Sequence, residues 1–224
     1  MSAKRESVLD LPLAAYKKWK SPLEQGFKLA AKFLRKESFF STRDLPYRTQ
    51  LVPLATILAL LDERWLEPKV LDKLRRWFWC GVLGELYGGA VESRFALDLQ
   101  EMTDWIAGGA DLPATVQDAS FQPQRLDTLR SRNSAAYKGI SVLVQRNGAQ
   151  DFFWKTTIRD LDESDWDECK LDIHHIFPKK WCEENAIPPP SLQLDSEQNR
   201  HFVQGEQNGG EESAFGLSGA ATDA

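Results

Sequence analysis

Residues 70–81 read VLDKLRRWFWCG, and the spacing of their apolar side chains indicates the fold class. Val70, Leu74, Trp77, Phe78 and Gly81 recur every three or four residues, which is the period of one face of an α-helix. We therefore predict a helix here that buries this face in a core. The basic residues of the stretch are predicted to form its solvated face: Lys69, Lys73, Arg75 and Arg76.

The segments that precede this stretch are also predicted to be helical. Residues 51–61 form an apolar run that predicts a buried helix. Ser21-Pro22 followed by Glu24 is typical of a helix start, because Ser can cap, Pro suits the first turn and Glu completes a capping box. The apolar residues of that helix recur at helical spacing: Leu23, Phe27, Ala30, Ala31 and Leu34.

The segments that follow continue the helical pattern. Gly88-Gly89 is predicted to end the helix of residues 70–81, and residues 90–106 are predicted to form another that Gly108-Gly109 ends. Two short helices are predicted over residues 126–129 and 135–144, the second capped by Asn133 or Ser134. The fold class is therefore mainly α, and four tryptophans at helical positions are assigned to its core: Trp65, Trp77, Trp79 and Trp105.

The composition limits the classes of protein to which the chain can belong but does not indicate its function. The chain has 224 residues and a net charge of -5, so any argument for nucleic acid must rest on local basic patches. Its three cysteines, Cys80, Cys169 and Cys182, do not resemble a disulfide framework, which favours a cytoplasmic location. The longest apolar run, residues 51–61, contains Pro53 and is too short to span a bilayer, so we expect no membrane association.

A different pattern follows residue 147 and carries the candidate chemistry. Residues 171–178 read LDIHHIFP and hold two of the three histidines in the chain. Neighbouring residues on a strand point to opposite faces, and Pro178 favours a bend just beyond them. One imidazole can then bind a cation while the other faces a water molecule at a phosphate. We predict a first strand over residues 171–176, a second near 192–196, and a helix from about Asn199.

Three segments together resemble a known family. Residues 171–181, LDIHHIFPKKW, are similar to the motif of the C-terminal HNH region of GmrSD-type restriction proteins. Residues 77–88, WFWCGVLGELYG, and 132–139, RNSAAYKG, resemble the helical portion of the same proteins. The resemblance covers about residues 45–200. It implies a metal-dependent DNA endonuclease of a phage-defence system, acting on modified phage DNA.

The resemblance also implies roles for individual residues. His174 would be a metal ligand, and His175 would be the general base that takes a proton from the attacking water. Asn199 would orient this base, and Asn208 would complete the metal shell. The expected metal is Mg²⁺ or Mn²⁺, with Zn²⁺ as an alternative.

The resemblance divides the chain into three parts. Residues 1–147 would form a helical domain, family-like from about residue 45, and residues 148–208 a small ββα-metal module. Residues 209–224 are expected to be a disordered or out-of-frame tail. The family's ParB-like N-terminal half is not recognisable in this sequence, so we expect it on the same or a neighbouring chain.

Basic residues near the motif are candidates for binding the DNA backbone. Lys179 and Lys180 follow the histidines directly, while Arg130, Arg132 and Lys138 belong to a locally positive stretch that runs from Arg125 through Arg146 to Lys155. Ordinary charge on a helix face explains this stretch equally well. The acidic run of residues 160–168 is expected to face away from DNA.

Two other functions remain open from the sequence. The chain could be a catalytically inactive fragment that serves as a helical module for binding DNA or protein. Alternatively, Zn²⁺ could staple a structural domain through thiolates and imidazoles, the candidates being Cys169, His174, His175 and Cys182.

Overall fold

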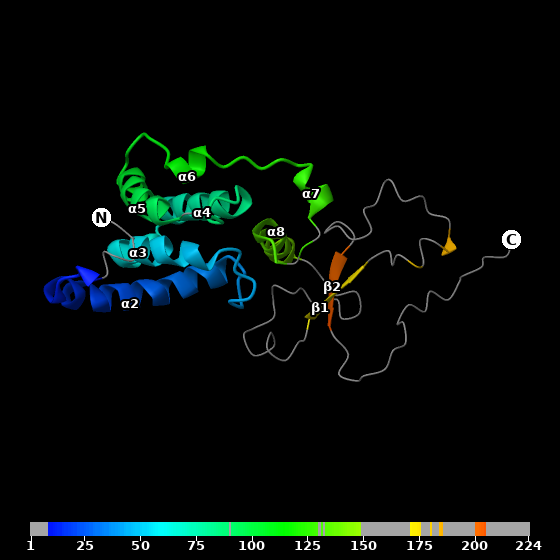
Figure 1. The fold of residues 1–224 in the computed structure, drawn as a ribbon, viewed down its shortest axis with the longest axis horizontal. Coiled ribbons are helices and arrows are strands. Elements are labelled where there is room, and N and C mark those ends of the chain that lie inside the picture. Colours follow the sequence, from blue (N-terminus) through cyan, green and yellow to red (C-terminus); the bar gives the residue numbers. More distant parts are fainter. Residues whose placement is uncertain are drawn as a thin grey trace.

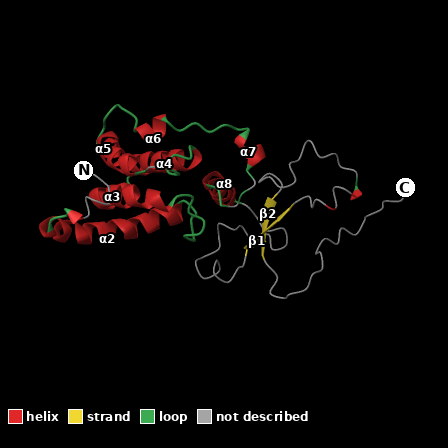
Figure 2. Cartoon of the chain, in the orientation of Figure 1, coloured by secondary structure: helices red, strands yellow, loops and turns green. Residues whose placement is uncertain are grey.

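The computed structural model of the chain describes residues 9–89, 91–129, 131, 133–148, 171–175, 180, 184–185 and 200–204, the last of these ranges and residues 171–175 by their backbone. This part is mainly helical (Figures 1 and 2). Its longer helices are α2 (Leu13–Lys36), α3 (Leu51–Leu61), α4 (Pro68–Leu83), α5 (Glu92–Ile106) and α8 (Ala135–Arg146). Two single-turn helices, α6 (Ala114–Gln117) and α7 (Arg125–Thr128), lie between α5 and α8, and 3₁₀ turns occupy Arg48–Gln50 and Asp62–Leu66.

The helices pack in layers around α3. Figure 1 shows α2 along one side of α3, with α4 and α5 on the other side. At the crossing of α2 and α3 the two backbones approach closely, because a Cβ atom built on Gly26 would lie 2.2 Å from the carbonyl oxygen of Ala55. Only glycine fits this position without displacing backbone.

The core lies between these layers and is rich in aromatic side chains. Phe33 of α2 packs edge-on against Trp65 and against Phe78 of α4, with ring centroids 6.4 and 5.6 Å apart. Trp65, Trp77 and Trp105 are buried, as predicted, while Trp79 is partly buried and stacks on Phe39. These rings join α2, α4 and α5 into one apolar core.

The two strongest helix predictions are confirmed. α3 spans the predicted residues 51–61, and α4 buries the predicted face of Val70, Leu74, Trp77, Phe78 and Gly81. α5 likewise ends at Ile106, just before Gly108, whose φ of +110° is readily adopted only by glycine.

Other predictions for the helical part are wrong. α2 begins at Leu13 and contains Pro22, so the capping signal at Ser21 does not start a helix. Phe27 and Ala31 of its predicted apolar face are exposed. α4 ends at Leu83 with Gly84 as its C-cap, before Gly88 is reached.

The predicted solvated face of α4 is also incorrect at two positions. Lys73 donates a hydrogen bond to the carbonyl of Trp105 and lies 5.0 Å from the centroid of its ring. Arg75 binds a fully buried carboxylate, that of Glu37. Their long side chains therefore join α4 to neighbouring helices.

α8 is docked on α4 at a glycine. Ser134 is its N-cap and accepts a hydrogen bond from the backbone N–H of Tyr137, which selects Ser134 over Asn133. A Cβ on Gly139 would lie 2.6 Å from a methyl group of Val82, so the absence of a side chain permits the close contact. Helices thus follow one another to Arg146, and the domain boundary near residue 147 stays a prediction.

β1 (Leu171–His175) and β2 (Arg200–Gln204) form an antiparallel pair. β1 occupies the predicted first strand. The predicted second strand, residues 192–196, lies outside the described residues. The helix predicted from about Asn199 is wrong over residues 200–204, where Phe202 and Val203 favour a strand and the backbone pairs with β1.

Candidate functional site

The paired strands bring together all three histidines of the chain. His174 lies directly opposite His201 in the register, and His175 lies opposite Arg200. Cα atoms of directly opposed residues in an antiparallel pair are about 4.5–5.5 Å apart. His201 was not predicted as a site residue. Two features of the sequence could have identified His201. It is the only histidine besides His174 and His175, and it precedes Phe202 and Val203, which favour a strand.

The register also determines which positions share a face. Alternate residues of a strand lie on one face, and directly opposed residues lie on the same face. Positions 172, 174 and 201 therefore share one face of the pair, whereas position 175 is on the other. One carboxylate and two imidazoles are residue types that bind divalent cations of the transition series and zinc.

Of the other site residues predicted in the C-terminal module, Lys180 is the one that the structure describes. Asn199, Asn208 and Lys179 lie outside the described residues. Lys180 is 88% exposed, and its ammonium is 3.9 Å from a carboxylate oxygen of Glu184. An exposed pair at this distance is weak, which leaves the lysine charge accessible to an anion.

The predicted basic stretch around α8 is largely engaged in contacts within the protein. Lys138 is partly buried and donates to the carbonyl of Arg43. Arg125 lies 3.3 Å from Glu85, and Arg146 lies 2.7 Å from Glu37. Arg130 and Arg132 lie outside the described residues. These ion pairs reduce the local positive charge that the stretch was expected to offer to DNA.

A fully buried carboxylate, that of Glu37, joins three helices. It accepts hydrogen bonds from Arg75 at 2.6 Å, from Arg146 at 2.7 Å and from the indole N–H of Trp79 at 2.9 Å. These partners come from α4 and α8, while Glu37 is the C-cap of α2. Since both of its oxygens are bonded to donors within the protein, we assign this carboxylate a structural role.

A second buried carboxylate, that of Asp98, lies in α5. It accepts from the indole N–H of Trp77 at 2.9 Å, from the Thr115 hydroxyl at 2.6 Å and from the Tyr87 hydroxyl. Burial, and then the neighbouring Asp98 charge, raises the pKa of Tyr87, so this hydroxyl stays protonated and donates. The cluster holds the segment after α4 against α5.

Both carboxylates were missed in the sequence, although each lies on an apolar helix face. Glu37 follows Ala30, Phe33 and Leu34 at intervals of seven, four and three residues. Asp98 precedes the buried Met102 and Trp105 at intervals of four and seven. An acidic residue at a core position of the helical period is the signal that identifies a buried, partnered carboxylate.

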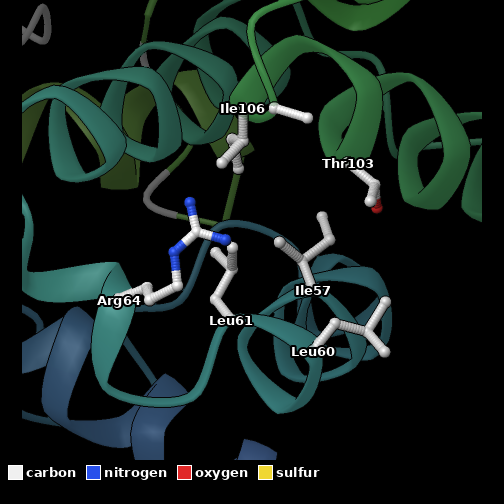
Figure 3. Close-up of a pocket in the computed structure, with 7 residues that line it drawn as sticks. Ile57, Leu60, Leu61, Arg64, Thr103 and Ile106 are labelled. Carbon is white, nitrogen blue, oxygen red and sulfur yellow. The ribbon is translucent and has the colours of Figure 1, made fainter.

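The described helices also border a small cleft (Figure 3). It has a volume of about 110 Å³ and lies between α3 and α5. Its lining is apolar except for Arg64 and Thr103, and the Arg64 guanidinium extends toward Ile106. Pockets that bind small molecules usually measure about 300–1,000 Å³, so this cleft is too small to be a substrate site.

Other candidate chemistry among the described side chains is sparse. Among the side chains that the structure describes, which do not include those of the strand pair, no group of three or more His, Cys, Asp or Glu residues is arranged to hold a metal ion. The Cys80 thiol is partly buried on α4, and burial raises its pKa, which makes it a poor nucleophile. Cys169 and Cys182, the other proposed zinc ligands, lie outside the described residues.

The chain is similar to part of a longer archaeal protein. No protein-family model matches the chain. The chain is 30% identical over 142 residues to an uncharacterized protein of Methanocaldococcus jannaschii. The matched part is 62% of this chain and 23% of the archaeal protein, so the chain spans less than a quarter of that relative's length.

A helix that crosses a lipid bilayer needs about 20 predominantly apolar residues. None of the helices in the part of the chain that the structure describes combines the length and apolar character needed to cross a membrane.

Proposed function

We propose that the chain is the nuclease part of a metal-dependent DNA endonuclease of the HNH type. The observation that carries the proposal is the placement of His174 and His175 on β1, with His201 directly opposite His174. Adjacent positions on a strand face opposite sides, so the two neighbouring imidazoles are suited to separate tasks. A small ββα-metal module is the architecture we propose around them.

The donor types on one face of the strand pair fit a divalent cation. Positions 172, 174 and 201 supply a carboxylate and two imidazoles. His174 would hold the cation, with His201 as a second imidazole beside the Asn208 proposed from the family resemblance. When bound, Mg²⁺, Mn²⁺ or Zn²⁺ would offset the negative charge that develops on the phosphate.

The reaction that we propose is hydrolysis of a DNA phosphodiester. The neutral imidazole of His175 takes a proton from a water molecule, whose oxygen forms a bond to phosphorus as the bond to the leaving oxygen breaks. Asn199 would fix the orientation of this imidazole. Lys180, exposed and weakly paired, would bind a neighbouring phosphate together with Lys179.

The helical part is proposed to support this module. Contacts of Arg125, Lys138 and Arg146 with protein groups leave fewer free charges for DNA on α8. Arg130 and Arg132 would still bind the DNA backbone. Recognition of modified phage DNA would then depend on a ParB-like partner region, on the same chain or another.

A plasmid-cleavage assay tests the proposal. The purified chain is incubated with supercoiled plasmid and Mg²⁺, Mn²⁺ or Zn²⁺, and His175→Ala is expected to reduce the rate of nicking by about 10²–10⁴-fold. His174→Ala is expected to raise the metal concentration needed for half-maximal rate. Glu67→Gln, an exposed change in the helical part, is the matched control and should cleave normally.

Two results would reject the nuclease proposal. A wild-type chain that nicks no DNA with any of the three ions favours an inactive binding module. Zinc that copurifies with the chain and is needed for folding, without cleavage, favours a zinc-stapled structural domain.

A further inference from the structure

The first half of α2 exposes an apolar stripe. Every fully buried residue of α2 lies at Gly26 or later, on the half that packs against α3. Ahead of this point Leu13 is 65% exposed, Tyr16 49% and Trp19 38%, and Phe27 is 49% exposed just beyond it. α2 has 24 residues and α3 has 11, about 36 and 16 Å in length, so α3 cannot cover all of α2.

The spacing of the stripe matches a helix–helix seam. Intervals of three and four residues alternate along the positions Leu13, Tyr16, Lys20, Leu23, Phe27, Ala30 and Leu34. Ala30 and Leu34 are already buried in the core, so the seam begins inside the protein and continues into solvent. A narrow stripe with a seven-residue repeat packs against another helix, and one lysine within it is a typical device that fixes register.

The charges near the seam indicate which side chains a partner helix should carry. Between Leu13 and Lys28 there are four exposed lysines, Lys17, Lys18, Lys20 and Lys28, and one acidic residue, Glu24, giving a local charge of +3. A second copy of α2 would place lysines against lysines, which disfavours self-association. Lys17 and Lys28 lie beside the seam and Lys20 lies within it, whereas Lys18 is on the opposite face of α2. Acidic residues at the edges of the partner seam would therefore pair with Lys17, Lys20 and Lys28.

We propose that the exposed half of α2 binds an amphipathic helix of a partner polypeptide that carries acidic side chains along its edges. This surface, the α2 seam, is separate from the strand pair with the histidines. The inference therefore does not depend on the proposed nuclease activity. The α2 seam would attach the helical part to a larger assembly.

A designed peptide tests the α2 seam directly. The probe is a fluorescein-labelled peptide of about three heptads, with Leu at the seam positions and Glu at the flanking positions. Its binding to the full chain is measured by fluorescence anisotropy. Saturable binding is expected, at least about tenfold tighter than that of the same peptide with Lys in place of Glu.

Two variants and a control identify the surface. The double variant Tyr16→Asp/Phe27→Asp should weaken binding of the Glu peptide by at least about tenfold, because it puts charge into an apolar seam. Leu97→Asp changes an equally exposed apolar residue, 49%, on α5 and should leave binding unchanged. The triple variant Lys17→Glu/Lys20→Glu/Lys28→Glu should prefer the Lys peptide. Circular dichroism checks that each variant is folded.

Several outcomes would overturn the proposal. Equal binding of the Glu and Lys peptides would contradict the proposed charge of the partner. An equal loss of peptide binding in Leu97→Asp and in Tyr16→Asp/Phe27→Asp would contradict the location of the surface on α2. A wild-type chain that sediments as a dimer and becomes a monomer in Tyr16→Asp/Phe27→Asp would assign the seam to a second copy. Binding of phosphatidylglycerol vesicles that is lost in the same variant, without peptide binding, would assign it to a membrane surface.

Discussion

The helical part and the strand pair use polar residues in opposite ways. In the helical part, Glu37 and Asp98 are buried and each accepts three hydrogen bonds from protein donors. In the strand pair, the register puts positions 174 and 201 opposite each other on one face and position 175 on the other face, and all three are histidines. A buried carboxylate whose partners are all supplied by the protein stabilises a fold, whereas an imidazole, which titrates near neutral pH, can bind a cation or accept a proton. Burial and polarity alone therefore do not identify a reactive site.

The largest effect on stability is expected from the Glu37 cluster. Glu37→Ala leaves two guanidinium groups and an indole N–H without their carboxylate, which should destabilise the fold by about 3–5 kcal/mol. Thermal unfolding followed by circular dichroism should show a fall of more than about 6 °C in the midpoint.

The exposed pair of Arg64 and Glu67 supplies the control for that prediction. Glu67 is 53% exposed and lies 3.2 Å from Arg64, so Glu67→Ala should cost less than about 1 kcal/mol. If the two variants unfolded at the same temperature, the Glu37 cluster would not be the support we assign to it.

A smaller loss is expected at the crossing of α2 and α3. In an exposed helix, Gly→Ala is stabilising by about 1 kcal/mol. At Gly26 the added Cβ would lie 2.2 Å from the backbone oxygen of Ala55, so Gly26→Ala should instead destabilise by about 1–3 kcal/mol in urea unfolding. Gly89→Ala, where a Cβ meets nothing within 4 Å, should be nearly neutral. If Gly26→Ala left the free energy of unfolding unchanged, α2 and α3 could move apart at this crossing without cost.

The smallest effect concerns Asp44, which lies near Lys138. Burial raises the pKa of this carboxyl above its ordinary value of 3.8, while Lys138 lowers it to a lesser extent. A raised pKa in the folded state means that stability is fully present below pH 3.8 and is lost as the group ionises. Asp44→Asn should therefore stabilise the protein at pH 7, by roughly half a kcal/mol or less because the carboxyl is partly exposed. The gain should vanish below pH 3.8, and a gain that grew in acid would contradict this cause.

Much of the helical part could be predicted because its signals are local. An apolar run located α3, the period of three and four residues located the buried face of α4, and two glycine pairs bounded most of α5. Local signals also misled. Ser21, Pro22 and Glu24 match a helix start, but the helix runs through them, because packing and neighbouring turns outweigh one capping pattern.

Contacts between distant residues could not be predicted from local patterns. Glu37 and Arg146 are 109 positions apart, and no periodicity connects them. The ion pair of the partly exposed Arg146 with the buried Glu37 was therefore not predicted, and Arg146 was counted with the surface charge. Similarly, the register that sets His174 opposite His201 depends on pairing between two strands that are 24 residues apart in the chain, whereas the sequence suggested a helix from about Asn199.

Histidine-labelled NMR tests the central claim most directly, because all three histidines of this chain lie in the strand pair. The full chain, labelled with ¹⁵N and ¹³C at histidine, is titrated with Mn²⁺, and each ring signal is assigned by the variants His174→Ala, His175→Ala and His201→Ala. The account predicts that the His174 and His201 signals broaden first, at substoichiometric Mn²⁺, while a Glu67→Gln chain behaves as wild type. Three ring signals that stay sharp and unshifted with excess Mn²⁺, Mg²⁺ and Zn²⁺ would contradict it.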